Sequence, residues 1–441
     1  MKYKLVLLPV LLLLGKISLA QSSNSLTLKA AINLSLANSK YLYQNKVAID
    51  KAAAALLEAK QNKLPNASIS GSYLQLSQAN VDLKLKSNNT SGQPTEVPKI
   101  NSAMYGTLNL SLPIYAGRKI KFGIVAAELL EKATKLDLES QKDEVINNTI
   151  EAYANLFKAF KAVALEKENL VQAQQREKEF TNLEKNGLLA RNDLLKTQLQ
   201  TGNTELALLD AENNLDLAKL NMNLLLGQPL ETSIQIDTLN LNYNSNNLTL
   251  VQCLQNANSN RSDVAANQLR AEASALSVKS IQAEKMPSVA LTGGYIAATI
   301  PKVITINNAI NIGVGVSYNI SSLWKNKAKV QQAQANTKQL ELNNGIINDR
   351  ITQQVSSQFY SLQLAQKKIL VLQQATEQAN ENYRIVKNKY NNSLATLSDL
   401  LESDVAKLKS DLNLLFAKVD GFVTYNHLLQ STGLLSKTFQ Q

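Results

Sequence analysis

The chain has few of the residues on which most enzyme active sites depend. Its 441 residues include one cysteine, Cys253, and one histidine, His427. A zinc site needs three or four Cys, His or carboxylate ligands, and a Ser-His-Asp or Cys-His relay needs a nucleophile beside its histidine. No nucleophile motif lies near His427, and no Gly-rich phosphate loop is present. The sequence therefore predicts a protein that is not an enzyme, with no catalytic residue, no metal site and no cofactor.

Proline is also scarce, and its eight positions are uneven. None lies between residues 114 and 228 or after residue 301. Because an interior proline breaks a helix, these two spans can hold long helices. We expect helices at about 118–185 and 324–391, the first ~100 Å long at 1.5 Å per residue. Such a helix is too long for an ordinary globular core.

Long apolar runs are missing except at the N-terminus, so no later helix is expected to cross a membrane. At the N-terminus, Lys2 and Lys4 precede the apolar stretch 5–14, and Ser18-Leu19-Ala20 is a small-x-small cleavage site. This pattern predicts a secretory signal peptide at residues 1–20. The alternative is a single anchoring helix, for which the apolar run is too short.

Positive charge is in moderate excess, with 46 Lys and Arg against 35 Asp and Glu. Removal of the predicted signal peptide takes away three lysines and lowers the formal net charge from +11 to +8. The remaining excess is spread along the chain, without a basic cluster or interleaved aromatic residues. The sequence therefore predicts no nucleic-acid partner.

What the sequence does contain is a tandem repeat. The segment 24–28 recurs at 246–250, an offset of 222 residues. Towards the end of each copy the offset is 206 residues, as Gly227 and Gly433 show. The difference places 16 extra residues in the first copy, in the polar loop 87–94. We divide the chain into repeat 1 (21–228), a linker (229–245) and repeat 2 (246–441).

The helices of each copy suggest two columns of equal height. Helices over 26–62 and 190–226 would have 37 residues each and, laid end to end, would match the long helix of the first copy. The apolar positions recur at steps of three and four residues in a narrow stripe. Such stripes favour coiled-coil pairing between helices.

Each copy also contains two segments with strand-like alternation. From Ile310 to Ile320 every second residue is apolar, whereas Asn311, Ser317 and Asn319 belong to the other face. Apolar-out, polar-in alternation over roughly ten residues is typical of a transmembrane barrel wall, whose lumen these three residues would face. A half-buried soluble sheet is the alternative. Four strands cannot close a barrel, so a barrel would need several chains. The expected strands lie at about 67–78, 104–115, 288–299 and 309–320.

The order and spacing of these elements resemble the outer membrane efflux protein family, the TolC-like exit ducts of Gram-negative bacteria. The resemblance covers the mature chain and is most specific at the junction 110–118, the hairpin 186–195 and the segment 223–229. It implies a mainly α fold with a small β part. Three chains would form a homotrimer, with an α-helical tunnel and one shared twelve-stranded transmembrane β-barrel.

The resemblance also implies a function and partners. The protein would be the passive exit duct of a tripartite efflux or type I secretion system, in the outer membrane with a large periplasmic part. Its partners would be outer-membrane lipid, a periplasmic adaptor protein and an inner-membrane RND or ABC transporter. A soluble periplasmic coiled-coil scaffold is the alternative, and it leaves the alternating strands without a purpose.

The family's periplasmic entrance carries rings of acidic residues. By motif match, Asp399 and Glu402 fall on these positions, and their spacing of three places them on one helix face. Six carboxylates of a trimer would then surround the entrance and favour cations. The alternative is that carboxylates in a first helical turn complement the helix dipole.

Other residues fall on positions that link neighbouring hairpins in the closed state of similar proteins. These are Tyr390 and Asp193. The family's arginine in this network is replaced by Ala395, and Arg191 on the other hairpin is a candidate substitute.

The two hairpin tips are the expected docking surface for the adaptor. They contain Gly187 and Leu188 in the first copy, and Ser393 and Leu394 in the second. Gly187 suits a left-handed turn, whereas Ser393 stands where the family usually has glycine. A plain interhelical turn is the alternative for both tips.

Overall fold

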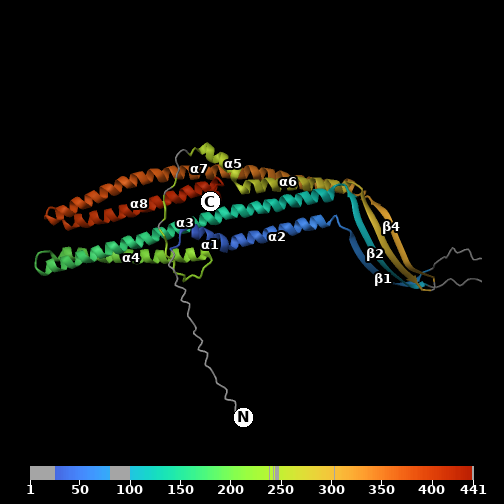
Figure 1. The fold of residues 1–441 in the computed structure, drawn as a ribbon, viewed down its shortest axis with the longest axis horizontal. Coiled ribbons are helices and arrows are strands. Elements are labelled where there is room, and N and C mark those ends of the chain that lie inside the picture. The colour runs from blue at the N-terminus through green and yellow to red at the C-terminus, as the bar shows by residue number, and fades with distance from the viewer. Residues whose placement is uncertain are drawn as a thin grey trace, which may run out of the picture. The chain divides into compact units, whose positions relative to one another are not determined.

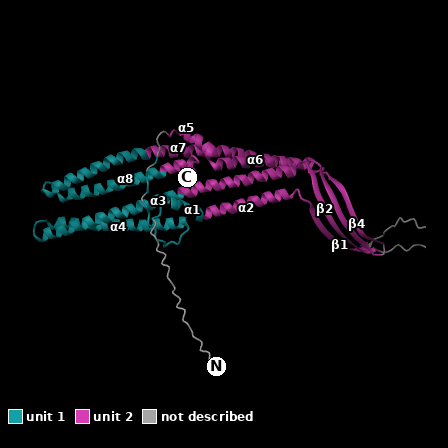
Figure 2. Ribbon diagram, viewed as in Figure 1, with its two compact units in different colours: residues 1–38, 148–243, 365–423 teal, residues 39–147, 244–364, 424–441 magenta. Residues whose placement is uncertain are grey.

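The computed structural model describes residues 25–79, 100–237, 239–241, 243, 248–301 and 303–439. The predicted signal peptide and the polar loop 87–94 lie outside these ranges. The described residues form two compact units (Figure 2). Unit 1 comprises those of Met1–Asn38, Asn148–Tyr243 and Ala365–Val423, and unit 2 comprises those of Ser39–Asn147, Asn244–Leu364 and Thr424–Gln441.

Helices make up most of both units (Figure 1). The two long ones, α3 and α7, are unbroken over 67 and 70 residues and contain no proline. Within the described ranges, no helix combines the length and the apolarity that a membrane crossing requires. The helices are α1 (Leu28–Asn38), α2 (Lys40–Gln61), α3 (Lys119–Lys185), α4 (Arg191–Leu226), α5 (Leu250–Asn260), α6 (Ser262–Gln282), the short 3-10 helix η1 (Ala283–Lys285), α7 (Ser322–Asn391), α8 (Leu397–Ser431) and α9 (Leu435–Phe439).

The expectation of one continuous helix over 26–62 was wrong, because the chain breaks between α1 and α2. Ser39 has an extended backbone (ψ 118°), and its side chain accepts a hydrogen bond from the Leu42 amide at 3.3 Å, which starts α2. The second copy breaks at Arg261, between α5 and α6, where the backbone is also extended (ψ 121°) but the side chain does not cap the next helix. Neither break contains proline, so the proline pattern did not predict them.

Unit 2 contains one antiparallel sheet with the strand order β1-β2-β3-β4 (Figure 1). The central pair, β2 and β3, joins the two copies of the repeat. In this chain β1 and β4 are edge strands. The bounds are β1 (Asn66–Ala79), β2 (Ile100–Ala116), β3 (Ser288–Ile300) and β4 (Ile304–Ser317).

The pairing register gives the sheet one apolar face and one polar face. Residues directly opposite each other on antiparallel strands share a face, and successive residues alternate between faces. Side chains on the apolar face of β4, from Ile310 to Val316, are 65–82% exposed in the chain. Two successive rungs show the alternation: Ile69, Leu108, Tyr295 and Ile310 lie on the apolar face, and Ser68, Asn109, Gly294 and Asn311 on the polar face.

The observed β4 is shifted towards the N-terminus relative to the expected strand at 309–320. Asn308 (φ 58°) forms a bulge and is hydrogen bonded to the Tyr295 hydroxyl. The bulge lets the pairing of β4 with β3 extend across the turn-like Asn-Asn pair, so the strand begins at Ile304. It ends at Ser317 because the Asn319 carbonyl accepts hydrogen bonds from the Ser322 amide and hydroxyl, at 3.0 and 2.6 Å, at the start of α7. Asn319 is therefore not a strand residue, contrary to its predicted place in the barrel wall.

Within unit 1, a buried tyrosine holds the first described residues in place through hydrogen bonds. The Tyr153 hydroxyl lies 2.7 Å from the Leu26 carbonyl and 3.2 Å from the Asp237 carbonyl, and Leu26 forms a parallel bridge with Ile236. Burial, together with the charge of Asp237, raises the pKa of Tyr153 to about 12, so the hydroxyl remains a donor at neutral pH.

Candidate functional site

Unit 1 contains the turns of two helical hairpins, α3–α4 and α7–α8 (Figure 1). The two turns have the same backbone conformation. Gly187 and Ser393 both have positive φ, 70° and 59°. The Leu188 amide donates to the Leu183 carbonyl at 2.9 Å, and the Leu394 amide donates to the Lys389 carbonyl at 2.8 Å. Both helices thus end in a Schellman motif with a left-handed residue.

The residue after each left-handed position is an exposed leucine. Leu188 is 74% exposed and Leu394 is 76% exposed. In a Schellman motif an apolar side chain at this position usually packs back onto the last helical turn. Here both side chains face solvent, so each predicted tip presents an apolar group that another surface could bury.

An apolar cluster joins the two hairpins behind their turns. Phe180 of α3, Leu194 of α4 and Leu397 of α8 are buried in it. Tyr390 of α7 packs against them, with its ring stacked on Phe180 at a centroid distance of 6.2 Å. All four helices of the two hairpins therefore contribute to one contact.

Two of the three predicted closure residues, Tyr390 and Asp193, are close enough for the charge of Asp193 to act on the Tyr390 hydroxyl. Burial raises the pKa of Tyr390, the charge of Asp193 raises it further, and the charge of Arg176 opposes this. Asp193 forms an ion pair with Lys196 at 3.4 Å. Arg191 instead pairs with Glu184 of its own hairpin at 3.5 Å. The role of Arg191 as a substitute for the family's arginine stays a prediction.

A link that the sequence analysis missed connects α3 to α8. The Arg176 Nη2 atom lies 2.9 Å from Asp404 Oδ2, and the two side chains are only 13% and 15% exposed. Helical spacing partly indicated that these two charged residues face the helix contact. Arg176 lies four residues before the buried Phe180, and Asp404 lies four residues after the buried Leu400. Which charge pairs with which depends on the register of the two helices, and the sequence did not indicate this register.

A cavity of about 520 Å³ lies beside this ion pair. Its lining includes Arg176, Tyr390 and Tyr383. The ammonium groups of Lys387 and Lys407 lie 5.6 and 5.4 Å from the centre of the Tyr383 ring, within the range of cation–π attraction. The wall between the hairpins is therefore both basic and aromatic.

Asp399 caps the start of α8 in the structure. Its Oδ2 atom accepts hydrogen bonds from the Thr396 hydroxyl and amide, at 2.6 and 2.9 Å, and the Asp399 amide lies 3.2 Å from the Thr396 hydroxyl. These bonds, led by the hydroxyl, lower the pKa of Asp399. This is the arrangement that the dipole alternative expects. Glu402 lies three residues further along α8 and is exposed.

The predicted lumen residues are placed by the sheet register. Asn311 lies on the polar face, opposite Gly294, and Ser317 lies on the same face, opposite Ser288. A side chain at Gly294 would have no room, because its Cβ would lie 2.7 Å from the Leu108 carbonyl oxygen. Asn319 lies past the end of the strand, as described above.

No cluster of at least three His, Cys, Asp or Glu side chains suited to a metal ion occurs among the residues that the structure describes. Cys253 is buried in α5, and burial raises the pKa of its thiol. His427 is partly buried in α8.

Comparisons with known proteins agree with this fold. The family model described as outer membrane efflux protein matches residues 31–228 and 253–434. The chain therefore belongs to the outer membrane efflux protein family, and its function is that of an efflux channel of the outer membrane.

Individual relatives are distant. "Toxin and drug export protein A" of Aggregatibacter actinomycetemcomitans is 23% identical over 429 residues, covering 92% of this chain and 85% of the relative. The crystal structure of VceC from Vibrio cholerae is 20% identical with a TM-score of 0.75, covering 92% of this chain and 96% of that one. The CmeC outer membrane channel of Campylobacter jejuni is 19% identical with a TM-score of 0.77, covering 94% and 88%. These two structures show the same fold.

Proposed function

We propose that three copies of the chain form a duct with a shared twelve-stranded β-barrel in the outer membrane of a Gram-negative bacterium. The observation that carries this proposal is the sheet, whose apolar face is exposed and whose two edge strands, β1 and β4, pair with no other strand of the described residues along their outer edges. Exposed sheet edges readily pair with another chain. Pairing of β1 with the β4 of a neighbouring copy, repeated three times, closes twelve strands.

A seam of exposed leucines on α4 supports contact between copies through the helices as well. Successive leucines are three, four, seven or eight residues apart, which keeps them on one side of the helix, as in a coiled-coil stripe. Large exposed apolar surfaces on a chain are typical of interaction sites. The seam consists of Leu195, Leu199, Leu206, Leu209, Leu217, Leu220 and Leu224, which are 40–67% exposed.

In this assembly the apolar face of the sheet contacts lipid, and the polar face, with Asn311 and Ser317, lines the lumen. The helices extend into the periplasm. The exposed tips at Gly187–Leu188 and Ser393–Leu394 dock a periplasmic adaptor protein, which connects the duct to an inner-membrane RND or ABC transporter. The name of the relative from Aggregatibacter actinomycetemcomitans supports export as the direction of transport.

The contacts between the two hairpins keep the periplasmic entrance closed. The Arg176–Asp404 ion pair and the stacking of Tyr390 on Phe180 both join one hairpin to the other. Removing one partner of a poorly exposed ion pair leaves the other charge unpaired, which is strongly unfavourable. Loss of Arg176 should therefore separate the hairpins and open the duct.

The test is the mass and the conductance of the purified mature protein. We expect a trimer in detergent and channels in planar bilayers, with Arg176→Gln opening more often than the native protein. Lys158→Gln is the matched control, since it breaks another α3–α8 ion pair, with Asp420, outside the hairpin cluster. A water-soluble monomer without conductance would support the scaffold alternative, and equal opening of all three proteins would disprove the closure role.

The acidic ring is tested by a separate pair of substitutions. In a trimer, Asp399 and Glu402 supply six carboxylates at the entrance, which favour cations. Asp399→Asn with Glu402→Gln should lower the preference for K⁺ over Cl⁻, measured from reversal potentials in a KCl gradient. An unchanged preference would leave only the helix-capping role for Asp399.

A further inference from the structure

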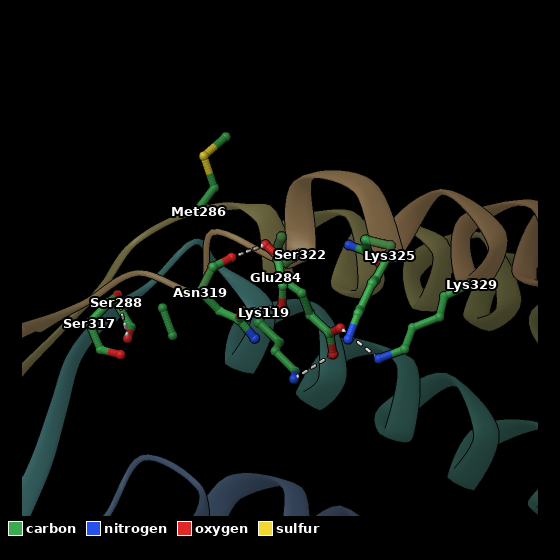
Figure 3. Close-up of a pocket in the computed structure, with 13 residues that line it drawn as sticks. Lys119, Glu284, Met286, Ser288, Ser317, Asn319, Ser322, Lys325 and Lys329 are labelled. Carbon is green, nitrogen blue, oxygen red and sulfur yellow. Dashed lines mark hydrogen bonds and ion pairs between the residues drawn. The ribbon is translucent and has the colours of Figure 1, made fainter.

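A second cavity, of about 380 Å³, lies in unit 2 where the strands meet the long helices. Its lining comes from the ends of β2 and β4, from the start of β3, from η1, and from the first turns of α3 and α7. Figure 3 shows the side chains of Lys119, Lys325 and Lys329 converging on Glu284. The function derived above assigns no role to this cluster.

The cluster has more positive charge than its single carboxylate can balance. Lys119 Nζ lies 2.8 Å from Glu284 Oε1, and Lys329 Nζ lies 3.4 Å from Glu284 Oε2. The hydrogen bond from Lys119 is the main cause that lowers the pKa of Glu284, so this carboxylate is ionised at neutral pH. Lys325 forms no ion pair with any residue that the structure describes. Three lysines against one glutamate leave two positive charges uncompensated.

The local backbone adds to this positive potential. Lys119 is the first residue of α3, and Lys325 lies in the first turn of α7. The N-terminus of a helix carries partial positive charge, which disfavours a lysine and favours an anion. Neither helix has an acidic residue in its first turn. The two longest helices thus begin with lysines at the positions where an anion is best stabilised.

The cavity lies at the end of the polar face of the sheet. Ser288 and Ser317 line it and are paired with each other, and Ala116, which is paired with Ser288, lines it as well. Ser317 follows Asn311, Gly313 and Gly315 along the polar side of β4. The apolar residues of the strand belong to the opposite face. A cavity on the polar side opens towards water rather than lipid in the proposed duct.

One of the residues that line the cavity, Asn326, has a buried amide acceptor without a donor. Asn326 lines the cavity and is 2% exposed, and its Nδ2 atom donates to the Ile281 carbonyl at 2.7 Å. Its Oδ1 atom is buried and accepts no hydrogen bond within the described part of the chain. A buried acceptor of this kind calls for a water molecule or for a ligand that carries an O–H or N–H group.

We propose that this cavity binds small solutes with two or more carboxylate or phosphate groups as they pass through the duct. Lys325 and Lys329 hold the anionic groups, and Asn326 accepts a hydrogen bond from a hydroxyl or amino group of the solute. The inference rests on the proposed function, because the orientation of the polar face towards the lumen makes the cavity accessible to cargo. A trimer has three such sites and therefore attracts anions at this level of the duct.

Binding is tested first, on the detergent-purified full-length mature protein, by calorimetric titration with citrate, which carries three carboxylates and one hydroxyl. The double variant Lys325→Gln, Lys329→Gln should bind citrate about tenfold more weakly. Lys327→Gln with Lys338→Gln is the control, since these lysines lie on α7 and do not line the cavity. Lys325→Arg with Lys329→Arg should retain binding. Equal binding by all variants, or no binding by the native protein, would overturn the proposal.

A second ligand tests the amide contact. Tricarballylate differs from citrate only by lacking the hydroxyl group, so it should bind about fivefold more weakly if that hydroxyl donates to Asn326. Equal affinities would show that Asn326 makes no contact with the solute.

Ion selectivity then tests whether the site faces the passing solution. In planar bilayers with a KCl gradient, Lys325→Gln with Lys329→Gln should shift the reversal potential towards K⁺ preference, and the control pair should not. Citrate binding with unchanged selectivity would overturn the role in cargo passage. Citrate binding without any channel activity would refute the proposed function while leaving the site itself in place.

Discussion

The two copies of the repeat form the same junction with different side chains. In each copy a helix ends at an asparagine, Asn38 or Asn260, and a left-handed glycine, Gly227 or Gly433, follows the last long helix. A Cβ at Gly227 would lie 2.8 Å from the Asn38 Cβ, and one at Gly433 would lie 2.8 Å from the Asn260 carbonyl carbon. In both copies the glycine therefore lies close to the end of the earlier helix.

The hydrogen bonds that fix the junction differ. In the first copy the side-chain amide of Asn38 donates to the Leu226 carbonyl at 2.7 Å. In the second copy Arg261 donates to the Ser431 carbonyl at 3.1 Å and forms two bonds, of 2.7 and 3.0 Å, with the Asp263 carboxylate. The comparison shows that the glycine and the helix break are the shared requirement. A neutral amide or a charged network can hold them in place.

Gly433→Ala should have the largest effect. The alanine would have to adopt φ near 71°, and its Cβ would overlap backbone atoms of Asn260 and Arg261. We expect the free energy of unfolding to fall by about 3 kcal/mol. For Gly227→Ala we expect a fall of about 2 kcal/mol, because its new Cβ meets a side-chain carbon instead of backbone. Gly202→Ala is the control, since nothing lies within 4 Å of that site in α4. Thermal unfolding in detergent gives the order, and a Gly433→Ala variant no weaker than Gly227→Ala would contradict it.

Arg261→Gln should have the next largest effect. It should lower the free energy of unfolding by about 2 kcal/mol, because it leaves the Asp263 carboxylate without its charged partner. Asn38→Ala, at the first junction, should cost about 1 kcal/mol through one neutral hydrogen bond. The same unfolding measurement compares the two. Equal losses would mean that the charge of the second junction adds nothing to its stability.

Acidic pH should weaken the second junction but not the first. Burial alone would raise the pKa of Asp263, but hydrogen bonds and the charge of Arg261 outweigh it and lower the pKa below its ordinary value of 3.8. A carboxyl group with a lower pKa in the folded state stabilises the fold above the unfolded pKa. This contribution is lost as pH falls below about 4. Arg261→Gln should flatten the acid dependence of unfolding between pH 5 and 3, measured by circular dichroism, and Asn38→Ala should leave it unchanged.

Tyr153→Phe makes the first copy resemble the second, where Phe359 occupies the equivalent position at the offset of 206. It removes the hydroxyl that donates to the Leu26 carbonyl and should cost about 1 kcal/mol. Faster amide hydrogen exchange at Leu26 and Asp237 would show the local loosening. Unchanged exchange would mean that the bridge between Leu26 and Ile236 holds this segment without the tyrosine.

The smallest effect is expected at the hairpin turns, where the copies differ between Gly187 and Ser393. Ser393 has φ 59°, which costs a residue with a Cβ more than it costs glycine. Ser393→Gly should therefore stabilise the protein by about 0.5–1 kcal/mol, and Gly187→Ser should destabilise it by a similar amount. Limited proteolysis at the turns, with thermal unfolding, measures both. A loss of stability in Ser393→Gly would contradict the strain argument.

The sequence predicted the features that depend on local pattern. Proline-free spans indicated α3 and α7, alternation indicated the strands, and Gly187 indicated the left-handed turn of the first hairpin. It did not predict the break at Ser39, which depends on a hydrogen bond to one serine side chain, or the close approach of the preceding residue, Asn38, to Gly227. It also placed Asn319 in a strand, because the alternation continues past the point where hydrogen bonds to Ser322 begin α7.

Long-range pairing was the part of the site that local pattern could not supply. The Arg176–Asp404 pair joins residues 228 positions apart, and the basic cavity collects Lys119 from the first copy with Glu284 and Lys325 from the second. Each side chain alone is an ordinary helix residue. For the ion pair, only the register between helices, set by buried apolar contacts such as Phe180 with Tyr390, brings the two charges together.

The pairing of β2 with β3 sets the order of events during synthesis of the chain. Partners across this pair, from Ala116 with Ser288 to Met104 with Thr299, are 172 to 195 residues apart. Contacts between residues so distant in sequence form slowly, and the N-terminal part of a chain emerges first from the ribosome. The β1–β2 hairpin must therefore wait, with the outer edge of β2 unpaired, until the strands of the second copy have been made. A chain of this design requires protection against aggregation on its way to the membrane.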